Sequence, residues 1–230
     1  MAERPIPPVT QELSGIDLKL LSPEKQEKLL KNARSFIQLM LYYKSAIREV
    51  ETKLQVLNDE FSMQYQRNPF ESIKSRIKTP ASILEKLARK GIDVNVENIE
   101  KYLHDIAGIR VICSFQQDIY AIAEMLLKQD DITLLKTKDY IKNPKPNGYR
   151  SLHLLLEIPI FLSNEKKPVC VEVQFRTIAM DFWASLEHKL KYKQNVENPE
   201  YIASELKICA DEIAQLDHRM QELHDLIIHP

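Results

Sequence analysis

Apolar residues recur at intervals of three and four from Leu29 to Leu57, which is the spacing of one face of an α-helix. Just ahead of this stretch, Ser22-Pro23 combines an N-cap residue with a proline at the first helical position. The pattern predicts one long helix or two, ending before Asn68-Pro69. Residues 1–21 are mixed in character and contain prolines. We expect them to form a flexible N-terminal arm ahead of a single domain that spans residues 22–230.

Five later segments favour β-strands, and the last of them alternates most regularly. There, apolar residues at 169, 171, 173 and 175 alternate with the polar residues Glu172, Gln174 and Arg176. One apolar face and one polar face are typical of a sheet that is covered on one side. The expected strands are Ser72–Lys78, Ile109–Phe115, Thr133–Ile141, Ser151–Ile160 and Pro168–Phe175, with a polar turn at Ser163–Lys167.

Helical patterns lie between and after these strands. One helix has Thr79 as its cap and Pro80 at its first position, and it stops at Gly91. Others are expected at Ile99–His104, residues 117–128 and Thr177–Lys191. Because the strands do not alternate regularly with full helices, a doubly wound nucleotide fold is disfavoured. The sequence predicts an α+β protein with a mixed, mainly antiparallel sheet of about five strands flanked by helices.

The final helix, expected at residues 198–228, carries apolar residues that alternate four and three apart. This spacing is a heptad seam. We favour oligomerisation through this helix, and the alternative is that the seam packs on the protein's own sheet. The seam consists of Ile202, Leu206, Cys209, Ile213, Leu216, Met220, Leu223 and Ile227.

Composition narrows the class of protein. The net charge of −1 over 230 residues gives no case for general binding to nucleic acid or membranes. The three cysteines are scattered without metal-type spacing, as in a reducing compartment. No apolar run approaches the length of a transmembrane helix, and the N-terminus has no signal-peptide profile. We expect a cytoplasmic protein.

The loop from Asp139 to His153 concentrates lysine, proline, tyrosine and arginine in a chain with only four glycines. Glycine-rich phosphate loops use backbone amides, and widely separated glycines exclude that arrangement here. Any phosphate must therefore be held by Lys and Arg side chains. Tyr149 follows the loop's only glycine, Gly148, and its ring could stack on a base. The alternative, a tyrosine folded back on the sheet, stays equally open.

Two carboxylates and a set of basic residues are the candidate chemistry. Asp105 precedes one predicted strand and Glu172 lies within another, so together they could hold one Mg²⁺. Each acid alone is better explained as a turn cap or a solvated strand residue. The basic residues could wrap a triphosphate, or they could form a solvated face. They are Arg76, Lys78, Lys86, Arg89, Arg110, Lys142, Lys145 and Arg150.

These pieces, in this order, resemble the synthetase domain of the RelA/SpoT family, and more closely the small alarmone synthetases of the RelP/RelQ kind. The likeness runs from about Ser72 to Lys193. Its motifs are Arg76-x-Lys78 with Ser82, Lys86 and Arg89; His104-Asp105-Ile-Ala-Gly108-Ile-Arg110; Gly148-Tyr149-Arg150-Ser151 with His153; Glu172-x-Gln174-x-Arg176-Thr177; and Ala179-Met180-Asp181-Phe182-Trp183 with Glu187-His188.

The resemblance implies a nucleotidyltransferase-like synthetase fold with long terminal helices. It also implies a Mg²⁺-dependent transfer of the β,γ-pyrophosphate of ATP to the 3′-hydroxyl of GDP or GTP, giving ppGpp or pppGpp. On the donor side, Arg76 and Arg110 would sandwich the adenine, while the ATP phosphates would be held by Lys78, Ser82, Lys86 and Arg89.

The same resemblance assigns the metal and acceptor roles. Asp105 and Glu172 would bind Mg²⁺, and Glu172 would also take the proton from the 3′-hydroxyl. Tyr149 would stack on guanine with Asp181 at its edge. The remaining acceptor residues would be Lys142, Lys145, His153 and Gln174.

The resemblance also sets expectations for the whole molecule. No counterpart of the family's hydrolase domain is present, so we expect synthetase activity alone, in a homotetramer assembled through terminal helices. Two alternatives remain. The same transfer could go to an adenosine nucleotide or to the 3′ end of tRNA. The near-neutral net charge argues weakly against tRNA. Alternatively, the chain could be a non-catalytic nucleotide sensor, which would not need both acids.

Overall fold

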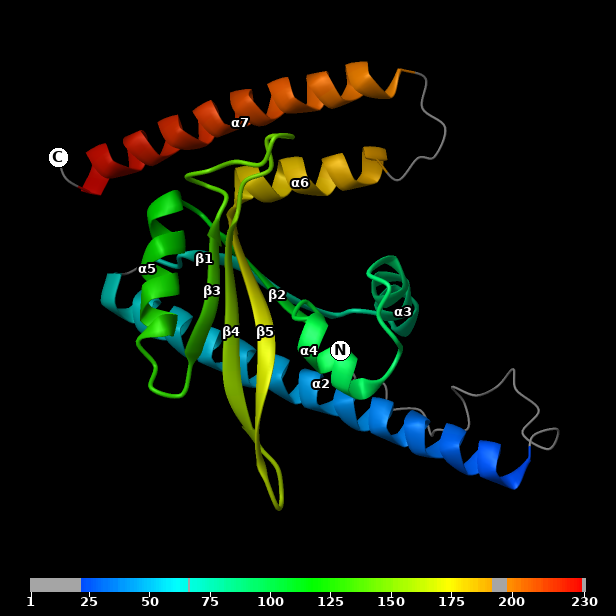
Figure 1. Ribbon diagram of the computed structural model, residues 1–230. Helices are drawn as coiled ribbons and strands as arrows, with labels where there is room; N and C mark the ends of the chain where they lie inside the picture. Colours follow the sequence, from blue (N-terminus) through cyan, green and yellow to red (C-terminus); the bar gives the residue numbers. More distant parts are fainter. Residues whose placement is uncertain (1–21, 66, 192–197, 229–230) are drawn as a thin grey trace.

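A single 43-residue helix, α2 (Pro23–Tyr65), crosses one face of a five-stranded sheet (Figure 1). The structure is a computed structural model that describes residues 22–65, 67–191 and 198–228. The expected N-terminal arm, residues 1–21, lies outside the described residues. Of the two alternatives for residues 22–65, one helix is confirmed.

The sheet has the strand order β1-β2-β5-β4-β3. Its central pair, β2 with β5, is parallel, and the other three pairs are antiparallel. The α+β prediction, a mixed and mainly antiparallel sheet of about five strands, is confirmed. The strands are β1 (Phe70–Ile77), β2 (Ala107–Cys113), β3 (Thr133–Asp139), β4 (Leu152–Phe161) and β5 (Lys166–Thr177).

The hydrophobic core lies between α2 and one face of the sheet. Val50 and Leu54 of α2 are fully buried in the same cluster as Val171 and Val173 of β5. The helix α5 (Gln116–Leu127) adds Ile122 and other apolar residues to this cluster. Burial of apolar side chains on this face leaves the opposite face of the central strands to polar side chains.

Several strand ends differ from the expected ones for local reasons. β5 is two residues longer at each end than residues 168–175, because Lys166 pairs with Phe161 of β4 and Thr177 pairs with Cys113 of β2. The hairpin turn is accordingly narrower than Ser163–Lys167. β3 stops at Asp139 instead of Ile141, since the Asp139 carboxylate accepts hydrogen bonds from two following backbone amides and begins a turn.

The shorter helices follow their capping residues. α3 (Pro80–Arg89) begins after Thr79, whose hydroxyl accepts a hydrogen bond from the Ser82 amide. α4 (Val96–Tyr102) begins three residues before the expected Ile99, because Asn95 caps it through the Asn98 amide. α6 (Ile178–Lys191) follows β5 directly.

The C-terminal helix α7 (Pro199–Ile228) packs on α6 and on the start of α5, beside the end of the sheet (Figure 1). Its buried positions are Ala210, Asp217 and Gln221. Asp217 accepts hydrogen bonds from the Thr177 hydroxyl at 2.9 Å and the Gln116 amide at 3.0 Å. Burial raises the pKa of Asp217, and these two hydrogen bonds oppose that shift.

The expected heptad seam of α7 does not pack on the protein's own sheet over its C-terminal half. Leu216, Met220, Leu223 and Ile227 are between 51 and 79% exposed. The polar pair Asp217 and Gln221 faces inward instead, because it satisfies polar groups at the start of α5 and the end of β5. We call the four exposed residues the α7 stripe. Within the described ranges, no helix is long and apolar enough to cross a membrane.

Removing a core side chain from α2 tests how far the fold depends on this helix. We expect Leu54→Ala to lower the free energy of unfolding by about 2–5 kcal/mol, because Leu54 is fully buried and its loss leaves a cavity. The matched control is Leu41→Ala on the same helix, where the side chain is 39% exposed. Urea unfolding measures both, and equal losses would contradict the placement of the core.

Candidate active site

The polar face of the central strands gathers the candidate residues by strand register. Gly108 of β2 lies opposite Glu172 of β5, and Arg110 lies opposite Gln174. On the flanking strands, Arg76 of β1 lies opposite Gly108, and His153 of β4 lies opposite Gln174. Because partners in register project to the same face of a sheet, these side chains share the face opposite α2.

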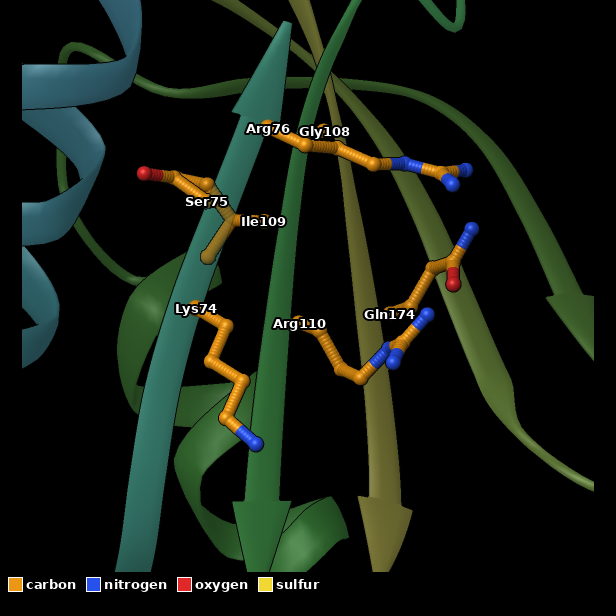
Figure 2. Close-up of a pocket in the computed structure, with 7 residues that line it drawn as sticks. All are labelled: Lys74, Ser75, Arg76, Gly108, Ile109, Arg110 and Gln174. Atoms are coloured by element: carbon orange, nitrogen blue, oxygen red, sulfur yellow. The ribbon is translucent and has the colours of Figure 1, made fainter. Parts of the chain in front are cut away.

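A first pocket of about 210 Å³ opens over β1, β2 and β5. Figure 2 shows the Arg76 side chain reaching across Gly108, with Arg110 and Gln174 directed toward the same space. Burial lowers the pKa of Arg110, as does the positive charge of Arg176, although Asp181 opposes the shift. Two guanidinium planes of this kind can stack on a flat ring.

Asp105 lies just ahead of β2 and is bound by two lysines. Its Oδ2 accepts from Lys78 Nζ at 2.6 Å and from Lys86 Nζ at 2.7 Å. Burial alone would raise the pKa of Asp105, but the hydrogen bonds and charges of these lysines prevail and lower it to about 2. The carboxylate is therefore ionised at neutral pH.

A second pocket of about 290 Å³ joins the two acids. Asp105 and Glu172 both line it, together with Lys86 from α3 and His153 from β4. Glu172 Oε1 lies 3.3 Å from His153 Nδ1, and Glu172 Oε2 accepts from Gln174 Nε2 at 2.7 Å. Burial favours a raised pKa for Glu172, but these hydrogen bonds lower it, so Glu172 is also ionised near neutral pH.

The two acids suit a hard cation. Asp105 Oδ1 is buried without a hydrogen-bond partner, which leaves an oxygen available as a ligand. The described part of the chain holds no group of three or more His, Cys, Asp or Glu side chains that could bind a metal. Mg²⁺ fits this arrangement, because it is commonly held by one or two carboxylates, with water and substrate phosphates completing its shell.

Some lining residues of the second pocket have no role assigned to them from the sequence. They are Lys90, Tyr102, His104, Lys136 and Lys138. The signal for the two β3 lysines was present, since Lys136 and Lys138 share strand parity, and Lys138 lies opposite His153 in the β3–β4 pair. In this part of the chain the predicted basic residues are Lys142, Lys145 and Arg150, which lie in the loop that follows β3.

Tyr149 is folded toward the sheet. Its hydroxyl accepts a hydrogen bond from Arg176 Nη2 at 2.9 Å and lies 2.8 Å from His153 Nε2. The side chain remains half-buried, and the Lys145 ammonium lies 4.6 Å from the ring centroid. Of the two alternatives for Tyr149, the structure shows the ring folded back on the sheet with its hydroxyl anchored, and stacking on a base stays a prediction.

The structure does not bring every candidate residue to these pockets. The Lys142 ammonium is exposed and lies over the Tyr120 ring. Arg89 is exposed at the end of α3, and the Ser82 hydroxyl accepts a hydrogen bond from Thr79. On the first turn of α6, Asp181 lies 2.8 Å from Arg176 and 3.4 Å from Arg110, so it pairs with arginines.

The loop that carries Tyr149 is docked on α6 and α7. Gly148 has a φ of +88°, and a Cβ placed there would lie 2.4 Å from the Cβ of Ala210. Asn147 donates to Glu187 of α6 at 3.1 Å. Arg150 lies 3.6 Å from Asp211 of α7 and therefore turns toward that helix. Arg150, one of the basic residues that could wrap a triphosphate, has this contact with α7, and its binding of phosphate stays a prediction.

Comparisons with known proteins agree with this geometry. A family model described as the region found in RelA/SpoT proteins matches residues 75–197. The GTP pyrophosphokinase YwaC of Bacillus subtilis is 46% identical over 181 residues, which cover 79% of this chain and 86% of that protein. The chain belongs to the RelA/SpoT family. A second relative, the GTP pyrophosphokinase YjbM of the same organism, is 37% identical over 186 residues, covering 81% of this chain and 87% of YjbM.

Solved structures of RelA/SpoT-family proteins share the fold. Small alarmone synthetase 2 from Bacillus subtilis matches with a TM-score of 0.75 and 44% identity, over 83% of this chain and 98% of that one. Small alarmone synthetase 1 from the same organism, bound to its product pppGpp, matches with a TM-score of 0.76 and 36% identity, over 84 and 97%. That protein bound to AMPCPP matches with a TM-score of 0.70 and 31% identity, over 86 and 100%.

A methyl group at Gly148 tests the docking of the loop. We expect Gly148→Ala to lift the loop from α7, since the new Cβ meets Ala210. Trp183, the only tryptophan, packs in the cluster with Ala210 and borders Tyr149, so its fluorescence should change. Gly91→Ala is the matched control, because Gly91 also has a positive φ (+66°) but has open space around it. Unchanged Trp183 emission in Gly148→Ala would contradict the docked arrangement.

Proposed function

We propose that this RelA/SpoT-family protein transfers the β,γ-pyrophosphate of ATP to the ribose 3′-hydroxyl of GDP or GTP, giving ppGpp or pppGpp and AMP. One observation carries the proposal. Gln174 lines the first pocket and Glu172, two residues earlier on β5, lines the second, so one strand joins two adjoining sites. A transfer between two nucleotides needs this arrangement, because both reacting groups must be held in line.

The first pocket is the donor base site. Arg76 and Arg110 stack on the adenine, which suits a pair of guanidinium planes on one sheet face. The donor phosphates extend toward Asp105 and exchange its lysine contacts for their own, since Lys78 and Lys86 carry the charge that the anion needs. Ser82 and Arg89, on the same helix as Lys86, complete the phosphate set.

Asp105 and Glu172 are the residues that hold Mg²⁺. When bound, the ion neutralises charge on the transferred pyrophosphate. The unpartnered Asp105 oxygen and the shared pocket support this assignment.

The acceptor lies beside Tyr149. Guanine stacks on the tyrosine ring, and Lys145, whose exposed ammonium already lies over that ring, moves toward the acceptor phosphates. Lys142 contributes positive charge from the same loop. Lys136 and Lys138 contribute positive charge from β3, where they line the second pocket. Gln174 lines the first pocket and His153 lines the second. Asp181 lies at the edge of the guanine and also forms an ion pair with Arg176.

Glu172 is the general base. It is ionised near neutral pH and borders the second pocket. In the step, Glu172 takes the proton of the 3′-hydroxyl while that oxygen forms a bond to the β-phosphorus of ATP. The bond from the β-phosphorus to the oxygen shared with the α-phosphate breaks, and AMP leaves with that oxygen. A positioned base assists because a ribose hydroxyl is a weak nucleophile.

Removing the base tests the reaction. With ATP, Mg²⁺ and either GDP or GTP, we expect wild type to form a 3′-pyrophosphorylated guanosine nucleotide, measured by ion-exchange separation. Glu172→Gln should lower turnover by roughly 10²- to 10⁴-fold while both nucleotides still bind. Glu157→Gln on β4 is the control, with the same substitution outside both pockets, and should keep wild-type turnover.

Two results would refute this proposal. Wild type that modifies tRNA or an adenosine nucleotide in preference to GDP and GTP would identify another acceptor. Wild type that binds nucleotides without turnover would indicate a sensor. A Glu172→Gln variant as active as wild type would refute only the base assignment.

We also propose that the protein is cytoplasmic and assembles into a homotetramer through its terminal helices. The α7 stripe supports the assembly, because four large apolar side chains along one helix remain exposed. Heptad spacing lets such a stripe pack against another helix.

A charge placed within the stripe tests the assembly. Leu223→Lys should lower the molar mass measured by light scattering during size-exclusion chromatography, because a buried lysine opposes helix association. Gln215→Lys adds the same charge at an exposed position outside the stripe and should leave the mass unchanged. A wild-type monomer, or equal behaviour of both variants, would count against assembly through α7.

A further inference from the structure

A continuous chain of hydrogen bonds links α6 to the proposed base. Arg176 donates through Nη1 to Asp181 Oδ1 at 2.8 Å and through Nη2 to the Tyr149 hydroxyl at 2.9 Å. That hydroxyl lies 2.8 Å from His153 Nε2, and His153 Nδ1 lies 3.3 Å from Glu172 Oε1. The chain therefore connects the ring beside the acceptor site with the carboxylate at the centre of the sheet.

The direction of each hydrogen bond follows from the first. The guanidinium can only donate, so the Tyr149 oxygen accepts from Arg176. The single hydroxyl proton of Tyr149 is then free to point at His153, which makes Nε2 the acceptor and leaves the ring proton on Nδ1. Nδ1–H donates to Glu172. Arg176 thus selects the one neutral tautomer of His153 that can bind the carboxylate.

Two donors orient the Glu172 carboxylate. His153 binds Oε1, and Gln174 binds Oε2 at 2.7 Å. Each carboxylate oxygen has a second lone pair, so Glu172 is fixed in direction and can still accept from a substrate hydroxyl. Gln174 lies on the same strand as Glu172. His153, by contrast, connects Glu172 to the loop through its contact with Tyr149. Only the second contact relates the base to the acceptor ring.

We propose that Arg176 and the Tyr149 hydroxyl are positioning groups, which orient Glu172 through His153 so that the acceptor platform and the general base keep one fixed relation. Arg176 suits this role because it is only 5% exposed and is itself held by Asp181. The ring of Tyr149 binds the acceptor, and its hydroxyl sets the geometry of the chemical step. This inference rests on the proposed pyrophosphate transfer.

Tyr149→Phe separates these two roles, because it keeps the ring and removes only the hydroxyl. We expect kcat to fall by roughly 10- to 100-fold, the usual loss when a group that orients a catalytic residue is removed. The KM for GTP should stay within about twofold of wild type, since ring stacking is kept. Tyr140→Phe is the matched control. Tyr140 packs edge-on against Tyr149 and His153, and its hydroxyl is not a member of the chain.

A second variant removes the hydrogen bond between Arg176 and the Tyr149 hydroxyl by changing the arginine. Arg176→Lys keeps the positive charge beside Asp181 but cannot donate as a fork, and its melting temperature shows whether the fold is intact. We expect its kcat to fall as in Tyr149→Phe, with the KM for GTP again unchanged. The double variant should be no slower than the slower single variant, because both substitutions interrupt one chain.

The outcomes separate this inference from the proposed function. Wild type that forms no product overturns the function and the inference together. An active wild type with a Tyr149→Phe variant of equal kcat overturns the inference alone. A raised KM with unchanged kcat would do the same, since it assigns the hydroxyl to substrate binding. Losses that multiply in the folded double variant would also overturn it, because they indicate two independent contributions.

Discussion

The pairing of β5 with β2 on one side and β4 on the other decides where the candidate catalytic groups lie. From residue 169 to 175 β5 alternates, with Val171, Val173 and Phe175 in the core and Glu172 and Gln174 on the open face. A shift of one residue in either pair would turn Glu172 into the core, where an unpaired carboxylate is strongly unfavourable. The apolar face against α2 therefore fixes the register, and the register sets the distances between acids, histidine and arginines.

Charge balance is the second constraint on this face. Arg76 and Arg176 lie close enough to Arg110 to disfavour its charge, and the lowered pKa of Arg110 reflects burial and this repulsion. Asp181 relieves it by pairing with two of the three. In the second pocket, Asp105 plays the same part for Lys78 and Lys86. The carboxylates thus hold the cations in place where the adenine and phosphates of ATP are proposed to bind.

Local features were readable from the sequence, and non-local ones were not. The cap at Thr79, the helix start at Pro23 and the alternation of β5 follow from residues close together in the chain, and the structure agrees with them. The parallel pairing of β2 with β5 joins segments about sixty residues apart, which no local spacing reveals. The same holds for the site residues, whose non-local contacts could not be predicted. The lysines of β3 reach the second pocket through register, while Arg150 turns to α7 through a contact invisible in its own segment.

Under the proposed function, Tyr149 is one side chain that serves both halves of the site. Stacking on a base needs only an aromatic ring, and phenylalanine would supply it without a polar group to satisfy. At this position, however, the end of the side chain meets Arg176 and His153, two buried polar residues that need a partner. A hydroxyl both accepts from the arginine and donates to the imidazole, which phenylalanine cannot do. Tyrosine thereby places an aromatic platform and a hydrogen-bond junction on a single rigid ring.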